Sequence, residues 1–437
     1  MRRLRGLRSV LAGRDFRRLY ATRLISQSGD GLFQVALAAY AFFDPQRQPT
    51  APAVAGAFAA LLLPYSLVGP WAGVFLDRWR RRQVLVFANL VRGSLVLVMA
   101  GVIAAGAPLA VLLGLGLAVV SVNRFFLAAL SAALPHVVAR TELVTANSLS
   151  TTSGTIAAFA GGGLGYGLRL VFGEGATGTA LLLATTTVWY LCSSLVALTM
   201  AKQLLGPDDG PTRLALRTAL GDVAHGLAAG AQHVWSRRPA GHALLVMASQ
   251  RFWYGLATLS VLLLYRNYFH ADEVAAGIGG LALVLGATGV GLFLAALITP
   301  VATRRLRKQT WITVVLVGAG VAQLAFGLPY RELLFVPAAL LLGLAAQSMK
   351  ICVDTLVQET VDDSFRGRVF SFYDVLFNVS FVSAAAVAAV ALPATGKSYA
   401  VLTLIALGHC ATGLGYAAVN RRSSRGSTVS AAGEASR

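Results

Sequence analysis

The chain has 437 residues, of which 56% are hydrophobic and only 13% are charged, and its mean hydropathy is +0.68. A soluble domain needs about 25% charged residues to cover its surface, so this composition excludes a soluble globule. The same hydrophobicity excludes an intrinsically disordered chain. The net charge of +19 fits a membrane protein whose cytoplasmic loops collect Lys and Arg, and the composition therefore predicts an integral membrane protein.

Twelve apolar runs are long enough to cross about 30 Å of hydrocarbon as helices. They are too long for the strands of a membrane barrel, so we expect an all-α protein with twelve transmembrane helices. In chain order the expected spans are residues 19–43, 52–76, 84–106, 109–134, 146–172, 178–203, 241–266, 275–302, 310–328, 332–357, 367–392 and 398–419.

The basic residues are dense in every second loop and sparse in the loops between them. The positive-inside rule therefore places both termini and the long middle loop in the cytoplasm of a multi-pass plasma-membrane protein. Because the basic residues are spread over alternate loops, they do not indicate nucleic-acid binding. We expect a basic segment at 1–18, a six-helix bundle at 19–203, a cytoplasmic central loop at 204–240 with a surface helix at 212–236, a second six-helix bundle at 241–419 and a disordered tail at 420–437.

A charged loop follows the second expected span and reads Gly73-Val-Phe-Leu-Asp77-Arg78-Trp79-Arg80-Arg81-Arg82. An Asp at a helix end can bind the positive N-terminus of a neighbouring helix, which the Gly allows to approach. The loop resembles the Gly-x-x-x-Asp-Arg-x-Gly-Arg-Arg signature of the major facilitator superfamily, with Arg80 where the family has Gly. The resemblance implies two six-helix halves and a gating role for Gly73, Asp77, Arg78, Arg81 and Arg82.

Three further stretches are similar to the macrolide-efflux and enterobactin-exporter-like branch of this superfamily. They are Ser26-Gln27-Ser28-Gly29-Asp30, the region from Asn123-Arg124-Phe125-Phe126-Leu127 through Leu134-Pro135-His136 to Thr145-Ala146-Asn147, and the segment from Val361 to Val369. The family's antiporter motif, Gly-Pro-x-x-Gly-Gly, would fall on residues 157–162, where the second glycine pair remains and Gly-Pro does not. We expect close helix packing at Gly161, Gly162 and Gly165.

Ionisable side chains at bilayer depth are costly, so each one is a candidate functional residue. At 1.5 Å per residue, Asp30 and Arg124 lie roughly 16 and 15 Å from the cytoplasmic edge, and we expect them to pair near the midplane. The resemblance also places Arg124 where the family's fourth span keeps an arginine linked to proton transfer. Protonation of Asp30 would break the pair and so link transport to the proton.

The second half carries its own candidate charges in the seventh and tenth spans. These are Arg251, Lys350 and Asp354, of which the last two lie one helical turn apart on one face. Arg92 and Asp374 are closer to the cytoplasmic ends of their spans. We interpret these two as structural ion pairs or as side chains that extend towards the headgroups.

The sequence predicts a secondary active transporter, most simply a proton-coupled exporter of amphipathic drug-like or macrolide-like molecules. The alternative is an exporter or carrier of an anionic solute such as a siderophore, and a non-transporting membrane receptor is a remote third.

The segment Gly396-Lys397-Ser398 ends like a P-loop, but Ala391 stands where the pattern has its first Gly, so we do not interpret it as a nucleotide-binding site. We expect no enzymatic activity, cofactor or metal, and a monomer whose partners are a small-molecule substrate, protons and the bilayer.

Overall fold

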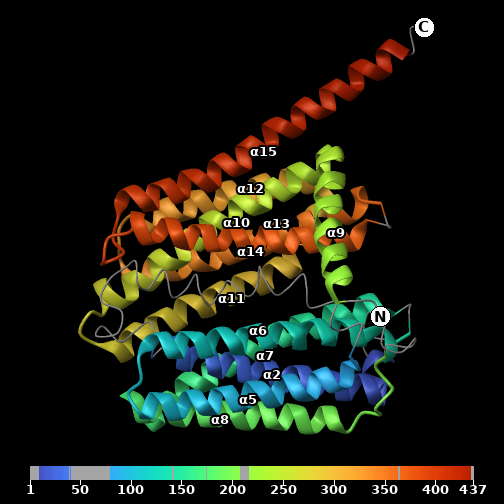
Figure 1. The fold of residues 1–437 in the computed structure, drawn as a ribbon. Helices are drawn as coiled ribbons and strands as arrows, with labels where there is room; N and C mark the ends of the chain where they lie inside the picture. The colour runs from blue at the N-terminus through green and yellow to red at the C-terminus, as the bar shows by residue number, and fades with distance from the viewer. Residues whose placement is uncertain are drawn as a thin grey trace. The chain divides into compact units, whose positions relative to one another are not determined.

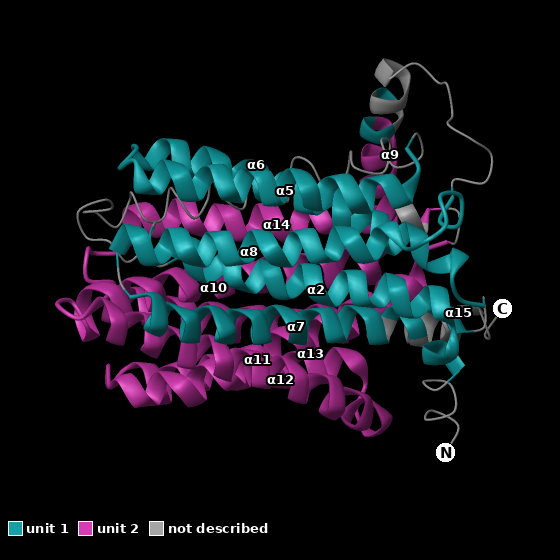
Figure 2. Cartoon of the chain, turned by 90° about the horizontal axis from the view of Figure 1, so that it is seen from below, with its two compact units in different colours: residues 1–49, 60–224 teal, residues 50–59, 225–437 magenta. Residues whose placement is uncertain are grey.

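The apolar runs of the sequence form long helices in the computed structural model, which describes residues 9–38, 40, 79–139, 142–173, 175–206, 216–362 and 365–434. All regular structure within these ranges is helical. Two compact units divide the chain: unit 1 comprises residues 1–49 and 60–224, and unit 2 comprises residues 50–59 and 225–437 (Figure 2). The boundary near residue 224 falls inside the central segment expected at 204–240.

Unit 1 contains five long helices among its described residues (Figure 1). They are α2 (Arg14–Leu37), α5 (Arg81–Ala104), α6 (Leu109–Ala133), α7 (Leu143–Phe172) and α8 (Gly175–Leu198), with a short 3-10 helix, η2 (Leu134–His136), after α6. The connection between α5 and α6, residues 105–108, is short and contains Gly106 and Pro108, which are suited to turns. Gly173 ends α7 with a φ of 83°, a left-handed conformation that glycine adopts at little cost.

Unit 2 includes α9 (Leu216–Ser236) from residue 225 onward, and this helix lies across the ends of the other helices of the unit in Figure 1. Its elements are α10 (Arg238–Leu264), α11 (Val274–Arg305), α12 (Lys308–Ala322), α13 (Phe335–Thr360), α14 (Arg366–Ala391) and α15 (Tyr399–Glu434). Two π-helical turns extend α10 and α12, namely η4 (Tyr265–Phe269) and η5 (Gln323–Gly327), and a 3-10 helix, η6 (Glu332–Leu334), precedes α13.

The two units repeat one pattern of helix pairing. In unit 1, α2 packs on α7 and α5 packs on α8; in unit 2, α10 packs on α14 and α12 packs on α15. If α2 holds the first expected span and α10 the seventh, the first span contacts the fifth and the third contacts the sixth in each half. This repetition fits two six-helix bundles built on one plan.

Nine helices within the described ranges are long and apolar enough to cross a membrane. The helices α2 and α10, which carry Asp30 and Arg251, are not among these nine. The second expected span, 52–76, lies outside the described residues, and so do the motif residues Gly73, Asp77 and Arg78. The structure therefore supports a multi-span all-helical protein.

The last helix departs from the expected disordered tail at 420–437. Helix α15 continues to Glu434. No proline interrupts the segment after the last span, so the backbone hydrogen bonding of the span can continue into it. The helix expected on the surface at 212–236 is α9.

Helices α2 and α7 approach each other closely through glycines. A Cβ built on Gly161 would lie 2.7 Å from the Cα of Ser28, and one built on Gly31 would strike the backbone of Ala158. At Gly165 a Cβ would lie 3.3 Å from the Cα of Leu32, whereas at Gly162 it would make only ordinary contacts. Small residues allow the two helix backbones to come into this close contact, whereas larger side chains would hold the helices apart.

Replacing Gly161 by Leu should therefore force α2 and α7 apart and lower the free energy of unfolding by about 1–3 kcal/mol. Gly163→Leu is the matched control. Gly163 lies on the same helix as Gly161, and a Cβ built on it meets no heavy atom within 4 Å. Thermal unfolding of the two purified variants in detergent micelles checks this. Equal melting temperatures would contradict the proposed packing.

Candidate functional site

A buried ion pair lies between α2 and α5 in unit 1. The guanidinium of Arg92 donates through Nη2 to Oδ1 of Asp30. Arg92 is 1% exposed and Asp30 is 7% exposed, so other protein atoms enclose both charges almost completely. Removing two charges from water is expensive, and a pair of this kind persists only when further hydrogen bonds satisfy both groups.

Those further hydrogen bonds come from α8 and α6. The hydroxyl of Tyr190 receives a bond from Arg92 Nη2 at 2.8 Å and donates to Asp30 Oδ1 at 3.0 Å. The side-chain amide of Asn123 on α6 donates to the other carboxylate oxygen, Oδ2, at 3.4 Å. The Arg92 guanidinium carbon also lies 4.0 Å from the centre of the Tyr190 ring, where the π-electrons attract a cation.

A second set of contacts continues this network towards the N-terminal end of α2. Arg92 Nη1 donates to Ser26 Oγ at 3.1 Å and to Asn89 Oδ1 at 3.0 Å. Asn89 in turn donates to Ser193 Oγ at 2.8 Å, and Ser193 donates to the Thr22 carbonyl at 2.7 Å. We refer to Ser26, Asp30, Asn89, Arg92, Tyr190 and Ser193 as the Asp30 network. It joins α2, α5 and α8 through side chains that are buried throughout.

Asp30 holds a special position among the acidic residues of unit 1. The described acidic side chains there are Asp15, Asp30 and Glu142, and only Asp30 lies deep within a helix of membrane length. Asp15 lies in the first turn of α2, and Glu142 precedes α7. A proton that reacts with a carboxylate within the described bilayer-depth part of unit 1 must therefore react with Asp30.

The structure pairs Asp30 with a residue that the sequence analysis assigned to a structural role. Helix α5 starts at Arg81, three residues earlier than the expected span, so Arg92 lies roughly 17 Å from one end and 18 Å from the other at 1.5 Å per residue. Arg124, the expected partner, follows Asn123 on α6 and is only partly buried. Successive helical residues point about 100° apart, so Asn123 and Arg124 face different neighbours.

A sequence signal for the missed residues does exist. Ser26 and Asp30, Asn89 and Arg92, and Tyr190 and Ser193 are polar pairs three or four residues apart in otherwise apolar spans. Residues at that spacing share one helix face. Three such faces in one half of the chain indicate a shared buried polar network, although they do not specify which helices meet.

Of the residues assigned to the gating loop, Arg81 and Arg82 lie in the described part of the chain, at the start of α5. Arg81 Nη1 donates to the carbonyls of Ala132 at 3.0 Å and Leu205 at 3.2 Å, and Arg82 Nη2 donates to the Leu198 carbonyl at 2.7 Å. Ala132 and Leu198 belong to the last turns of α6 and α8. Cations are favourable at helix C-termini, so the two arginines tie these ends to the beginning of α5.

Unit 2 contains a cation of a different kind. The guanidinium carbon of Arg251 on α10 lies 3.8 Å from the ring centre of Phe377, 4.9 Å from that of Phe381 and 5.1 Å from that of Tyr254. Its described contacts include no carboxylate, and its Nε is buried without a hydrogen-bond partner. Aromatic faces stabilise the charge but do not neutralise it.

Lys350 and Asp354 form the ion pair expected from their spacing on α13. The Lys350 Nζ lies 2.8 Å from Asp354 Oδ2, and the side chains are 36% and 29% exposed. The Lys350 ammonium also lies 5.2 Å from the centre of the Tyr373 ring. This pair is therefore more accessible than the pair of Asp30 and Arg92. Lys350 and Asp354 offset each other's charge.

Removing one member of the buried pair should be costly. Arg92→Met leaves the Asp30 carboxylate buried without its cation, and we expect the free energy of unfolding to fall by about 3–5 kcal/mol. Asp30→Leu combined with Arg92→Met removes both charges and should recover most of that loss. Denaturant unfolding of the purified proteins measures both. If the single variant is as stable as the parent, the pair does not contribute as its burial implies.

Comparison with known proteins agrees with this architecture. The family model described as Major Facilitator Superfamily matches residues 19–385. Two uncharacterised MFS-type transporters, Rv0037c of Mycobacterium tuberculosis and Mb0038c of Mycobacterium bovis, are each 38% identical over 392 residues. That match covers 90% of this chain and 88% of each relative.

Solved transporter structures share the fold at low sequence identity. A structure of the nucleoside transporter NupG superposes with a TM-score of 0.68 at 13% identity, over 92% of this chain and 99% of that one. A structure of the peptide transporter POT in complex with alafosfalin gives 0.68 at 15% identity, over 94% and 95% of the two chains. The family match and the two mycobacterial relatives establish that the chain is a membrane transporter of the Major Facilitator Superfamily and not an enzyme.

Proposed function

We propose that this transporter is a proton-coupled exporter of amphipathic small molecules in the plasma membrane. The observation that carries the proposal is the Asp30–Arg92 pair, because it places one protonatable carboxylate in a buried network shared by three helices. The stretches that resemble the macrolide-efflux branch favour export of drug-like or macrolide-like molecules. The gating role of the loop with Gly73, Asp77, Arg78, Arg81 and Arg82 belongs to the same proposal.

Protonation of Asp30 would change the balance between conformations. A neutral Asp30 no longer offsets the charge of Arg92, which would then be buried among Tyr190, Asn89 and Ser26 without a counterion. A conformation that gives Arg92 water or another anion becomes favourable by comparison. A proton thus binds one conformation better than the other, which is the thermodynamic requirement for coupling.

Uptake into inverted membrane vesicles tests the proposal, because such vesicles present the cytoplasmic face outwards. A panel of cationic, neutral and anionic amphiphiles is measured with and without an imposed proton gradient. We expect gradient-dependent uptake of cationic or neutral compounds. Absence of uptake for every compound, with folded protein in the vesicles, would argue against export.

Asp30→Asn should abolish gradient-driven accumulation and keep gradient-independent exchange of the same compound. One pH unit is worth about 1.4 kcal/mol for each coupled proton, so accumulation of about tenfold in the parent should fall to equilibration in the variant. Asp15→Asn is the control, because Asp15 is 41% exposed and pairs with Arg18 at 3.4 Å near the start of the same helix. Unchanged accumulation by Asp30→Asn would remove Asp30 from the mechanism.

The second candidate function is transport of an anionic solute such as a siderophore. It is favoured by Arg251, whose described contacts are aromatic rings and include no carboxylate. Hydrogen bonds to a charged group contribute about 1.5–3 kcal/mol, enough to orient an anion beside these rings. Within the same unit, the Lys350–Asp354 pair would add a positive charge and a counterion that the anion could replace.

If an anion is the substrate, Arg251→Leu should weaken its uptake by about 10- to 100-fold. The matched control is Arg237→Leu, which removes a cation 47% exposed and paired with Asp362 at 2.8 Å. Concentration dependence of uptake of an anionic amphiphile in the vesicles gives the comparison. Equal uptake by both variants would discard the anion hypothesis for this residue.

A further inference from the structure

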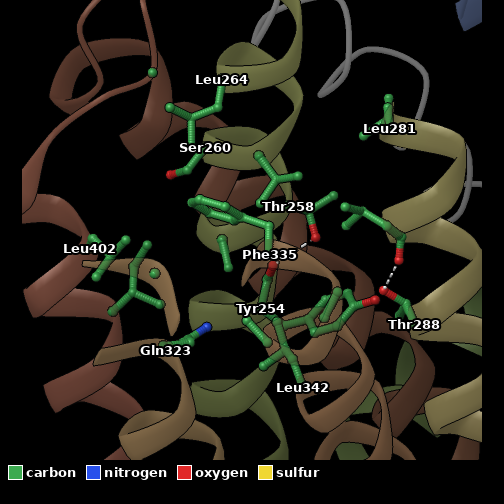
Figure 3. Close-up of a pocket in the computed structure, with 18 of the residues that line it drawn as sticks. Tyr254, Thr258, Ser260, Leu264, Leu281, Thr288, Gln323, Phe335, Leu342 and Leu402 are labelled. Atoms are coloured by element: carbon green, nitrogen blue, oxygen red, sulfur yellow. Dashed lines mark hydrogen bonds between the residues drawn. The ribbon is translucent and has the colours of Figure 1, made fainter. Parts of the chain in front are cut away.

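A pocket opens inside unit 2, and one of its lining residues, Tyr254, also contacts Arg251. Its volume is about 820 Å³, including the space at its mouth, and its walls come from α10, α11, η5, α13 and α15 (Figure 3). An apolar pocket with a small number of polar groups is a candidate binding site for a small molecule.

The walls of this pocket carry no charged side chain among the residues that line it. The hydroxyls of Thr258, Ser260 and Thr288 donate to carbonyls of their own helices, at 2.8, 2.9 and 2.9 Å. Leu, Val, Ala and Phe side chains make up most of the remaining wall. Because burial of an unpaired charge is costly, such a lining favours an uncharged and mainly apolar ligand.

One wall residue has an unsatisfied polar group. Gln323 is 8% exposed, and its Oε1 is buried without a hydrogen-bond partner. Figure 3 shows this side chain among those that line the pocket. An unpaired buried amide oxygen costs free energy, which a ligand that donates a hydrogen bond from a hydroxyl or amide group would recover. Gln323 is therefore suited to hold the polar end of a neutral molecule.

The local backbone gives independent support at the same place. Gln323 begins the π-helical turn η5 and Gly327 ends it, and both residues line the pocket. Such turns are rare and occur frequently at functional sites. Tyr330, which also lines the pocket, has a φ of 47°, unusual for a residue with a side chain, and its hydroxyl accepts a hydrogen bond from the Ser398 amide at 3.1 Å.

We propose that this pocket binds a neutral amphipathic molecule whose single hydrogen-bonding group contacts the Gln323 amide. The ligand class is an uncharged compound with an apolar body, such as a medium-chain alcohol. The inference goes beyond the transport proposal, because the pocket lies wholly within unit 2 and includes neither Asp30 nor Arg92. Binding is measured without transport, so either proposal can fail alone.

The test is photolabelling of the full-length protein in lipid nanodiscs with an octanol that carries a diazirine. We expect labels on pocket residues such as Leu264, Leu342 and Leu402, identified by mass spectrometry, and loss of labelling in excess octanol. Gln323→Leu should weaken the labelling by about two- to tenfold, the contribution of one hydrogen bond. Gln309→Leu is the control, since it makes the same replacement on α12 outside the pocket.

A carboxylate probe of the same length distinguishes binding in this pocket from simple partitioning into the bilayer. Because the lining residues carry no charge, we expect this probe to label the pocket weakly. Ala339→Phe fills part of the wall and should reduce labelling by the alcohol. Labels spread evenly over lipid-facing residues, equal labelling in Gln323→Leu and Gln309→Leu, or equal labelling by the carboxylate would each overturn the proposal. Labelling in detergent micelles but not in nanodiscs would assign the pocket to a lipid chain and also overturn it.

Discussion

The ion pair between Asp30 and Arg92 is the interaction on which the described part of unit 1 most depends. Neither charge can remain at that depth alone, because the surroundings offer almost no water. Their mutual hydrogen bonds, together with Tyr190, Asn89 and Ser26, place α2, α5 and α8 in one arrangement. A change in the charge of Asp30 therefore acts on three helices at the same time.

The packing around the pair makes this dependence possible. On one side α2 contacts α7 backbone to backbone through Gly31 and Gly161, so little adjustment is available there. At the start of α5, Arg81 and Arg82 hold the ends of α6 and α8. Unit 2 repeats the helix pairing of unit 1 but not its ion pair. The helix that corresponds to α2 is α10, and it carries Arg251 among aromatic rings where α2 carries a paired carboxylate.

Long spans could be predicted from the sequence because the bilayer requires about 20 apolar residues in succession. The partner of Asp30 could not, because helices that are apolar on every side contain little information about which face meets which neighbour. Arg92 and Arg124 are both cations in apolar helices, and a rotation of about 100° separates Asn123, which contacts Asp30, from Arg124. The polar pairs at three- and four-residue spacing do contain this information, but only when three spans are compared together.

The pocket beside Gln323 also could not be predicted from the sequence. A glutamine in an apolar span could equally well hydrogen-bond to a neighbouring helix, and only the surrounding side chains show that Oε1 has no partner. The π-helical turns at Tyr265–Phe269 and Gln323–Gly327 likewise leave no simple pattern in an apolar run. Such features depend on tertiary packing more than on local propensity.

Infrared difference spectroscopy of the protein in lipid, recorded as the pH is lowered, reports directly whether Asp30 takes up a proton. Asp30→Asn identifies the signal, because only the carboxyl group of that residue is removed. We expect a protonated-carboxyl band that appears across the pH range in which gradient-driven transport operates and that is absent in Asp30→Asn. A carboxylate that stays ionised throughout that range would show that Asp30 does not couple transport to the proton.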